Sequence, residues 1–288
     1  MIHTLTHITY IGHVDNEPVV NALFWPSGDD IINKEIEGVR ARRIILDQLE
    51  GGPRTGSELR ESIRKDMAAR QVSSKGKKVD PKKVKVTDPK LYFNTTHLED
   101  MGIIRSWRES QQRVFSLEPK AVHPVRRALG ISKPKVFLTS LALPEDARLL
   151  VAWLSTEASP DIKLLRLVVE QQRFARGVSK NLKKHIPAKA PRQWESRWLE
   201  LPIEIAGDNE GGLRGNLMST YTEIEKVILE DTPERDILVD LSSGTPTIVL
   251  ALSLLAMEYS LPAIHVQKYE GEKTTFTSIL PRRESTRV

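Results

Sequence analysis

The pattern of hydrophobic and polar residues differs between the two halves of the chain. In the first half, apolar residues recur every three or four positions in three segments, the spacing that places them on one face of a helix. These segments cover residues 35–49, 55–63 and 88–101. Two short apolar runs, 103–107 and 113–117, then flank a polar turn and predict a pair of strands. The pattern therefore predicts three helices followed by a hairpin.

Beyond Lys133-Pro134, strand-like and helix-like segments alternate, which is typical of a parallel sheet with helices on both faces. The expected strands cover 136–141, 162–169, 198–205, 236–241, 263–267 and 275–280. The expected helices cover 144–154, 176–185, 213–229 and 245–259. The predicted fold class is α/β, with a Rossmann-like parallel sheet in the C-terminal half.

Capping and stop signals indicate where the three helices of the first half begin and end. Gly51-Gly-Pro stops the first helix, and Ser57 is a suitable N-cap for the second. Asp88 as N-cap and Pro89 in the first turn begin the third helix, and Gly102 ends it. The third helix is therefore short and well delimited.

The order of three helices and a hairpin is that of a winged helix-turn-helix domain. The run YFNTTHLEDMGIIRS resembles the recognition helix and wing start of ArsR- and MarR-like regulators, and the likeness covers roughly residues 35–120. Helical spacing predicts an inward face made of Leu91, Thr95, Leu98 and Met101. It predicts an opposite, outer face made of Lys90, Asn94 and His97.

A winged helix that binds DNA places its outer face in the major groove, where asparagine pairs with adenine and lysine reaches guanine or phosphate. The DNA-binding residues expected on this basis are Lys90, Tyr92, Asn94, Thr96 and His97 on the helix, with Arg108 and Arg113 on the wing. The alternative is a solvated polar face on a structural winged helix. The Lys-rich segment 71–87 departs from the family pattern, which uses a tight turn, and is expected to be a mobile loop.

Positive charge is concentrated in one part of the chain. Residues 60–90 contain eleven basic and four acidic side chains, a net charge of +7, whereas the whole chain carries +5. The rest of the chain is therefore slightly acidic. This asymmetry predicts a basic module, with an anionic partner such as double-stranded DNA, joined to a neutral-to-acidic one.

The stretch VDLSSGTPTIVLALSLLAME, residues 239–258, predicts a strand, a turn and a buried helix. Such a turn lies at the carboxyl end of a central parallel strand, where open α/β sheets bind ligands. Thr245 fits the N-cap and Pro246 the first turn, and Gly244 allows a close backbone approach. The hydroxyls of Ser242, Ser243 and Thr245, with the first amides of the helix, favour an anionic ligand. The alternative is a capped helix start without a ligand.

The segment DLSSGTPT, residues 240–247, resembles the ligand-binding turn of CARF domains, the Rossmann-like sensors of CRISPR-associated proteins. The likeness covers roughly residues 134–283, and Thr139, Ser140 and Leu141 match a second ligand-contacting loop. Pro246 and Ser243 stand where the family pattern has a lysine and a glycine. The resemblance implies a homodimer that binds a cyclic oligoadenylate at Ser242, Ser243, Gly244 and Thr245 and at the 139–141 loop. Arg214 and Asn216 are further candidate contacts.

These observations predict a ligand-responsive transcription regulator of a CRISPR or defence locus. Its expected parts are an extension over 1–34 that could form a hairpin, a winged helix over 35–133 and a CARF-like sensor over 134–288. The alternative is a ring nuclease that cleaves the cyclic ligand, with the winged helix as a dimerisation module. In that case Ser140 or Ser242 would position the ribose, and Lys135 or Lys163 would supply charge. No residue pair has a spacing that demands catalysis.

Composition and hydropathy bear on disulfides, metal sites and membrane segments. The chain of 288 residues has no cysteine and seven scattered histidines, so neither disulfides nor a metal site is expected, and no cofactor beyond the signalling ligand. No apolar run reaches the roughly 18 residues that span a membrane, and the start lacks the order of a signal peptide. A cytoplasmic location is the expectation.

Overall fold

The computed structural model describes most of the chain. The described residues are 28–71, 80–81, 84, 86–143, 146–155, 162–173, 177–178, 180, 182, 184, 194–208, 214–268 and 274–280. The expected N-terminal hairpin, most of the Lys-rich segment and half of the helix expected over 176–185 lie outside them. The chain divides into two compact units, Met1–Ala121 and Val122–Val288. The expected boundary was Lys133-Pro134.

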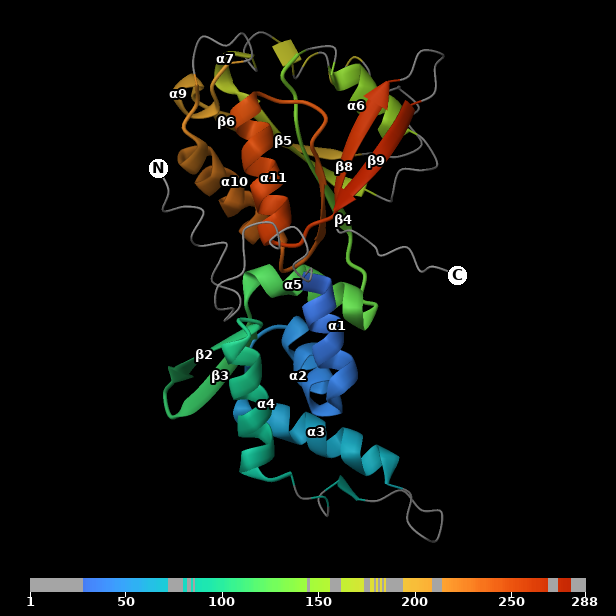
Figure 1. Ribbon diagram of the computed structural model, residues 1–288, viewed down its shortest axis with the longest axis vertical. Helices are drawn as coiled ribbons and strands as arrows, with labels where there is room; N and C mark the ends of the chain where they lie inside the picture. Colours follow the sequence, from blue (N-terminus) through green and yellow to red (C-terminus); the bar gives the residue numbers. More distant parts are fainter. Residues whose placement is uncertain are drawn as a thin grey trace, which may run out of the picture. The chain divides into compact units, whose positions relative to one another are not determined.

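The first unit is a group of helices with a small antiparallel sheet, coloured blue to green in Figure 1. Its strands lie in the order β1-β3-β2, so β3 pairs with both others. Its elements are α1 (Gly28–Gly38), α2 (Arg40–Glu50), β1 (Arg54–Thr55), α3 (Gly56–Arg70), α4 (Asp88–Asp100), β2 (Ile104–Glu109) and β3 (Gln112–Leu117). The helices expected over 55–63 and 88–101 and the hairpin are confirmed, whereas the helix expected over 35–49 is divided between α1 and α2. Strand β1 was not indicated by the sequence.

The helix starts differ from the predicted ones for local reasons. Extended backbone at Val39, with φ −138° and ψ 109°, separates α1 from α2, so the single helix expected over 35–49 is wrong. Thr55, not Ser57, is the N-cap of α3, because its hydroxyl accepts from the Glu58 amide in a capping box. Thr87, not Asp88, is the N-cap of α4.

The core of the first unit is built from the predicted apolar faces. Leu91 and Leu98 of α4 are buried against it, and Gly102, with φ +65°, ends that helix as expected. Met101 is 37% exposed, so its predicted inward position is wrong. The fully buried side chains of α2 and α3 are Ile45, Leu46, Leu59 and Ile63.

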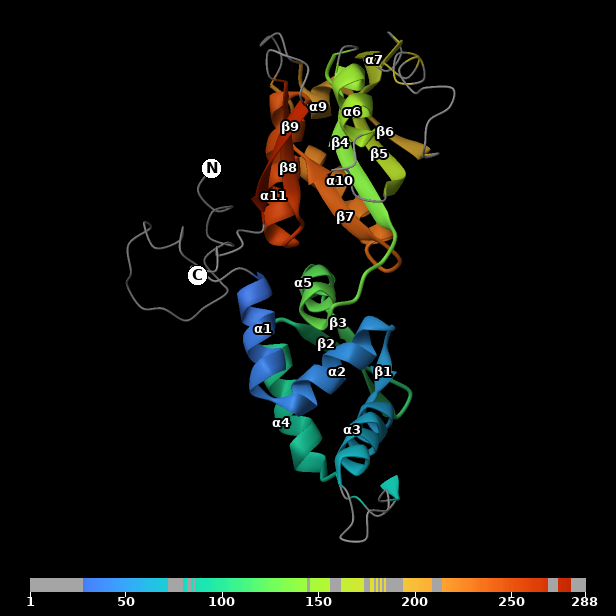
Figure 2. The same ribbon diagram turned by 90° about the vertical axis from the view of Figure 1, so that its right-hand side faces the viewer.

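The second unit is a six-stranded sheet with helices on both faces (Figures 1 and 2). The strand order is β6-β5-β4-β7-β8-β9; the first five strands are parallel and β9 is antiparallel to β8. Its strands are β4 (Lys135–Ser140), β5 (Ile162–Glu170), β6 (Glu195–Leu201), β7 (Asp236–Asp240), β8 (Ala263–Lys268) and β9 (Thr274–Leu280). Its helices are α5 (Pro119–Leu129), which begins at the end of the first unit, α6 (Asp146–Leu154), α7 (Gln171–Arg173), α9 (Ile203–Ala206), α10 (Leu217–Asp231) and α11 (Pro246–Glu258). The predicted Rossmann-like α/β architecture is confirmed.

Alternation along the strands divides the core into two layers. Leu138 and Val168 pack with α10 and α11 on one face, whereas Phe137 and Leu165 pack with Trp153 of α6 on the other. Because both faces are covered, the strands are apolar on both sides, as parallel strands usually are. The strand expected over 198–205 ends at Leu201, because the chain turns after it into the short helix α9.

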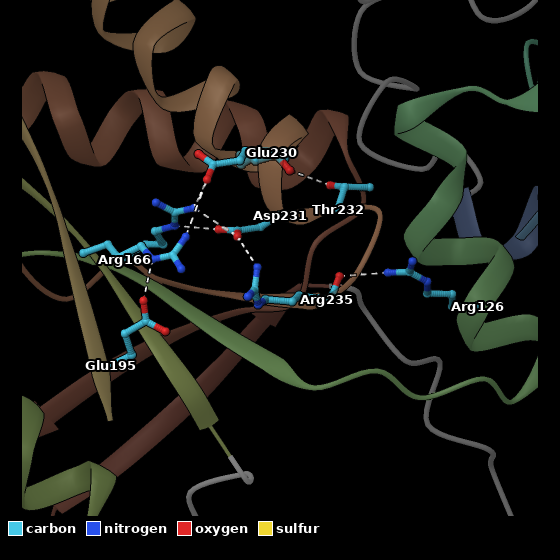
Figure 3. A network of polar contacts seen from close by, with 9 residues as sticks. Arg126, Arg166, Glu195, Glu230, Asp231, Thr232 and Arg235 are labelled. Atoms are coloured by element: carbon cyan, nitrogen blue, oxygen red, sulfur yellow. Dashed lines mark hydrogen bonds and ion pairs between the residues drawn. The ribbon is translucent and has the colours of Figure 1, made fainter. Parts of the chain in front are cut away.

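A buried ion-pair network fixes the end of α10 to the sheet. Asp231 is 1% exposed and accepts hydrogen bonds from Nε and Nη2 of Arg166 on β5, at 2.7 and 3.1 Å. Nη1 of Arg235 donates to the same carboxylate at 2.9 Å. Figure 3 shows Asp231 between these two guanidinium groups. Glu230, in contrast, is exposed and contacts Arg166 from the solvent side.

Helix α5, which the sequence did not indicate, is anchored to the turn between α10 and β7. Arg126 is 1% exposed and donates to the carbonyl oxygens of Pro233 and Arg235 at 2.7 and 2.8 Å. The His123 ring lies 3.3 Å from the Thr232 hydroxyl, and burial together with Arg126 lowers the pKa of His123 to about 3. A neutral His123 and an arginine that donates to two backbone carbonyls therefore fill the contact between α5 and the α10–β7 turn.

The described residues contain neither a membrane-spanning helix nor a group of metal-binding side chains. No helix among them is long and apolar enough to cross a membrane. Nowhere in the described ranges do three or more His, Asp or Glu side chains group as a metal ion would need.

The Asp231 network predicts an asymmetric response to mutation. Asp231→Ala leaves two arginines beside a buried space without their carboxylate, so we expect a loss of about 3 kcal/mol in the free energy of unfolding. Glu230→Ala is the matched control, because its exposed ion pair should contribute less than about 1 kcal/mol. Urea denaturation followed by tryptophan fluorescence measures both. Equal losses for the two variants would contradict the role assigned to Asp231.

Candidate functional site

The candidate site lies where β4 and β7 end, side by side in the middle of the sheet. These two strands are parallel neighbours, with Leu138 opposite Val239. From β4 the chain proceeds outward through β5 to β6, and from β7 it proceeds the other way to β8. The strand order therefore reverses between β4 and β7. At such a switch point the following loops diverge, and open α/β sheets bind their ligands there.

Gly244 brings the two loops into contact. Its φ of +134° is a conformation that side chains rarely adopt. A Cβ at this position would lie 2.7 Å from Oγ and 2.9 Å from Cβ of Ser140, at the end of β4. Only glycine therefore allows the β7–α11 turn to lie against β4.

A buried carboxylate holds the start of the same turn. Asp240 is 4% exposed; its Oδ2 accepts from the Thr139 hydroxyl at 2.7 Å, and its Oδ1 accepts from the Ser242 amide at 3.0 Å and from the Ser242 hydroxyl. Burial raises the pKa of Asp240 above its ordinary value, and these hydrogen bonds oppose that rise. Asp240 thus ties β4 to β7 and fixes the direction of the turn.

A second carboxylate organises the loop after β4. Oδ2 of Asp146, the first residue of α6, accepts from the amides of Ala142 and Leu143 at 3.0 and 2.7 Å. The Ser243 hydroxyl donates to the same oxygen and accepts from the Ala142 amide at 3.1 Å. Asp146 therefore joins the two loops from the opposite side to Asp240.

Thr245 joins the turn to a third segment. Its hydroxyl accepts from the Ile248 amide at 3.3 Å, as the predicted N-cap of α11, and donates to the Ala206 carbonyl at the end of α9. The segment before α10 packs closely against the end of α9, because a Cβ on Gly215 would lie 2.3 Å from the Ile205 carbonyl oxygen. Three loops therefore meet at the carboxyl edge of the sheet.

The structure brings together most of the predicted ligand residues but uses their hydroxyls internally. The hydroxyls that donate to protein acceptors are those of Thr139, Ser242, Ser243 and Thr245. The expectation that the hydroxyls of the turn point at a ligand is therefore wrong for this conformation. They keep lone pairs that can accept hydrogen bonds, since each hydroxyl accepts as well as donates.

The other predicted contacts differ in their surroundings. Oγ of Ser140 is buried and has no hydrogen-bond partner among the described residues. The Leu141 side chain is 2% exposed and belongs to the apolar core beside α6, so only its backbone can meet a ligand. Asn216 is the N-cap of α10, where its Oδ1 accepts from the Ser219 amide at 3.0 Å, and Arg214 is exposed nearby.

Two site residues were not predicted from the sequence. The sequence pattern indicates Asp146 only as part of a helix, although an aspartate in a first turn is a signal for capping. Ala206 has no chemical signal at all, because its carbonyl takes part only through tertiary packing. The two lysines of the ring-nuclease alternative lie elsewhere: Lys135 and Ile162, which precedes Lys163, are paired at the start of β4 and β5. A six-residue strand of about 17 Å separates that edge from Ser140.

The second candidate site is the outer face of α4, and here one prediction is corrected. Asn94 is 9% exposed, accepts from Nε of Arg42 at 3.3 Å and donates to the Lys90 carbonyl at 2.7 Å. Nε2 of His97 lies 2.9 Å from the Glu35 carboxylate of α1. Asn94 and His97 therefore face the helices of their own unit, because Glu35 and Arg42 supply polar partners there. The outward placement of Asn94 is therefore wrong, whereas His97 contacts Glu35 and still exposes 38% of its side chain.

The remaining residues of this candidate interface stay on the surface. Lys90, Tyr92 and Arg108 are exposed, and Thr96 is half-buried. Arg113 is paired with Glu99 of α4 at 2.8 Å and lies over the Phe115 ring at 5.2 Å, which fixes the hairpin beside α4. The sequence did not single out Phe93, which is 69% exposed on the same helix.

No protein-family model and no curated protein matches the chain. The solved structures that are similar to parts of it include the following three. Enterococcus italicus Csm6 bound to cyclic hexa-2′-fluoro-hexa-dAMP has 11% identity, 48% coverage of this chain, 34% of its own and a TM-score of 0.34. Can2 from Sulfobacillus thermosulfidooxidans in complex with cyclic tetra-adenylate is 16% identical over the matched part, with a TM-score of 0.33. The match covers 46% of this chain and 32% of Can2. Protein VC1899 from Vibrio cholerae is 14% identical over the matched part, with a TM-score of 0.34. The match covers 49% of this chain and 35% of VC1899.

The matched part covers only about a third of the length of each of these proteins. At such identities and TM-scores the likeness carries no argument about activity. What this chain binds must therefore be inferred from its own geometry and sequence.

The contact between Gly244 and Ser140 predicts a specific loss of stability. Gly244→Ala places a Cβ against Ser140 and forces alanine into a positive φ, so we expect a loss of about 2 kcal/mol or more. Adding Ser140→Gly to the Gly244→Ala variant should restore only part of the lost stability, because the clash is removed and the backbone strain at position 244 remains. Gly38→Ala is the control, since nothing lies within 4 Å of the added Cβ. Thermal unfolding measures all three, and a Gly244→Ala variant as stable as Gly38→Ala would refute the assignment.

Proposed function

We propose that this protein is a ligand-responsive DNA-binding regulator. In this proposal the second unit is a CARF-like sensor for a cyclic oligoadenylate, and the first unit is a winged helix that binds double-stranded DNA. The observation that carries the proposal is the Gly244 contact with Ser140 at the β4–β7 switch point. It supports a binding role because a glycine at positive φ and two carboxylates shape this turn more elaborately than a helix cap requires.

The polar groups of the site suit a nucleotide rather than a simple anion. Ser243 and Asp146 present oxygens that can accept from ribose hydroxyls or from the adenine amino group. The Thr247 amide, in the first turn of α11, has no acceptor within its helix by position and can donate to a phosphate. A ligand that repeats ribose, base and phosphate therefore matches both kinds of group.

A homodimer is part of the proposal, because the family resemblance places the cyclic ligand across a two-fold axis. Helix α11, which begins at the candidate site, carries Leu250 and Met257 on one face, seven residues apart. These side chains are 49% and 61% exposed. Burial against a second copy would remove this apolar surface from water.

The DNA-binding part of the proposal is supported by the helix and hairpin order of the first unit and by its charge. Lys90 on α4 and Arg108 on the β2–β3 hairpin are exposed, as contacts with phosphates require. A ligand can change DNA binding only if it binds one arrangement of the two copies more tightly than another. The ligand and the DNA are therefore coupled through the dimer.

Ligand binding is testable by thermal shift with cyclic tetra-adenylate and cyclic hexa-adenylate. A ring at 100 times its Kd should add about 2.7 kcal/mol of stability. Ser243→Ala should reduce the shift, because it removes the link to Asp146 at the site. Ser253→Ala is the matched control within α11, where the hydroxyl donates to the Val249 carbonyl. No shift with either ring, or an unchanged shift in Ser243→Ala, would contradict the proposed site.

DNA binding is testable by fluorescence anisotropy with the DNA directly upstream of the coding sequence. Lys90→Ala and Arg108→Ala should each weaken binding and lower the slope of log K against log salt by about one. Lys226→Ala, an exposed lysine on α10 of the second unit, should leave both unchanged. Binding that is equally strong in Lys90→Ala and Lys226→Ala would exclude α4 as a phosphate contact.

A further inference from the structure

The exposed surface of α4 carries two aromatic side chains, Tyr92, which the sequence predicts as a DNA contact, and Phe93, which it does not. Phe93 is 69% exposed and Tyr92 is 56% exposed, and their rings meet edge to face with centroids 6.1 Å apart. Lys90 lies one turn before Phe93, and Thr96 one turn after it. These four residues form a continuous outer stripe, which we call the α4 stripe.

Two polar residues that could have formed this face, the buried Asn94 and the partly exposed His97, are instead held by a tertiary network. The Glu35 side chain is 7% exposed and contacts both Arg42 and His97. Arg42 in turn donates to Asn94. Turning Asn94 or His97 outward would leave the nearly buried Glu35 or Arg42 with fewer partners, which is costly for a charged group. The α4 stripe is therefore the face that α4 offers to a partner.

An exposed phenylalanine at the centre of this stripe needs an apolar counterpart. In the DNA major groove, the one apolar group on a base edge is the C5 methyl of thymine, and phenylalanine is among the side chains that contact it. The surroundings favour DNA as that partner, because Lys90 and the hairpin residues Arg105 and Arg108 are exposed. Residues 60–90, which lead into the stripe, carry a net charge of +7.

We propose that Phe93 is a specificity-determining residue that contacts a thymine methyl group in the major groove. The proposal rests on the proposed DNA-binding function and adds to it the base that is recognised. Phe93 contributes selectivity for A·T pairs, whereas Lys90 and Arg108 contribute sequence-independent affinity. Because Phe93 is mostly exposed in the free protein, replacing it changes the interface and leaves the fold intact.

The test compares one DNA fragment made in two forms. The fragment upstream of the coding sequence is synthesised with either dTTP or dUTP, which removes every thymine methyl and keeps the base pairing. Binding of the full chain, Phe93→Ala, Phe93→Leu and Lys90→Ala is measured by fluorescence anisotropy at several salt concentrations. Retention of the thermal unfolding temperature confirms that the variants are folded.

We expect the unaltered chain to bind the thymine form at least about fourfold more tightly than the uracil form, the factor that one buried methyl group gives. Phe93→Ala should bind both forms alike, with an unchanged salt slope. Phe93→Leu should keep part of the preference, because leucine is also apolar. Lys90→Ala should keep the preference and lose about one unit of salt slope.

Equal binding of the two DNA forms by the unaltered chain overturns this inference and leaves DNA binding in place. A thymine preference that persists in Phe93→Ala also overturns it, because another residue would then contact the methyl group. No binding to either form overturns the proposed DNA-binding function and the inference with it. Unaltered DNA binding in every variant also overturns the inference, because the α4 stripe would then lie outside the DNA interface.

Discussion

The contact between Gly244 and Ser140 is the constraint on which the candidate ligand site depends. It sets how closely the turn after β7 approaches the end of β4, and no residue with a Cβ fits there without displacing Ser140. Asp240 fixes the approach from within the sheet, and Asp146 fixes it from the loop side. The three hydroxyls of the turn are used to build this geometry. The site is therefore shaped before any ligand arrives, which reduces the entropy that binding must overcome.

Two carboxylates so close to the turn determine what the site can accept. Asp240 and Asp146 accept the hydroxyl protons of Ser242 and Ser243, so these oxygens can offer a ligand only their remaining lone pairs. Phosphate must then be met by backbone amides and by the α11 helix terminus, not by serine hydroxyls. This separation of acceptor and donor groups suits a cyclic oligonucleotide, whose sugars and bases carry donors and whose phosphates carry acceptors. It also explains why a lysine in the turn is not required to hold the loops together.

Periodicity predicted the strands and most of the helices of this chain, whereas cap signals were right for Thr245 and wrong for Ser57 and Asp88. The parallel strands, the N-cap at Thr245 and the glycine at position 244 follow from local rules, because strand alternation and helix starts are local. Tertiary effects account for what was missed. Asn94 has a polar side chain and lies on a polar stripe of α4, yet Glu35 and Arg42, distant in sequence, supply partners that bury it. Asp146 was similarly hidden, because its role needs Ser243 beside it.

Hydrogen exchange on the full chain tests the central claim most directly. Backbone amides are followed with and without saturating cyclic tetra-adenylate or cyclic hexa-adenylate. Binding at the junction of the β4 and β7 loops predicts slower exchange at residues 140–143 and 242–248, beyond any change in the strands beneath them. Unchanged exchange in both segments with both rings, or slowing confined to other parts of the chain, would contradict the account.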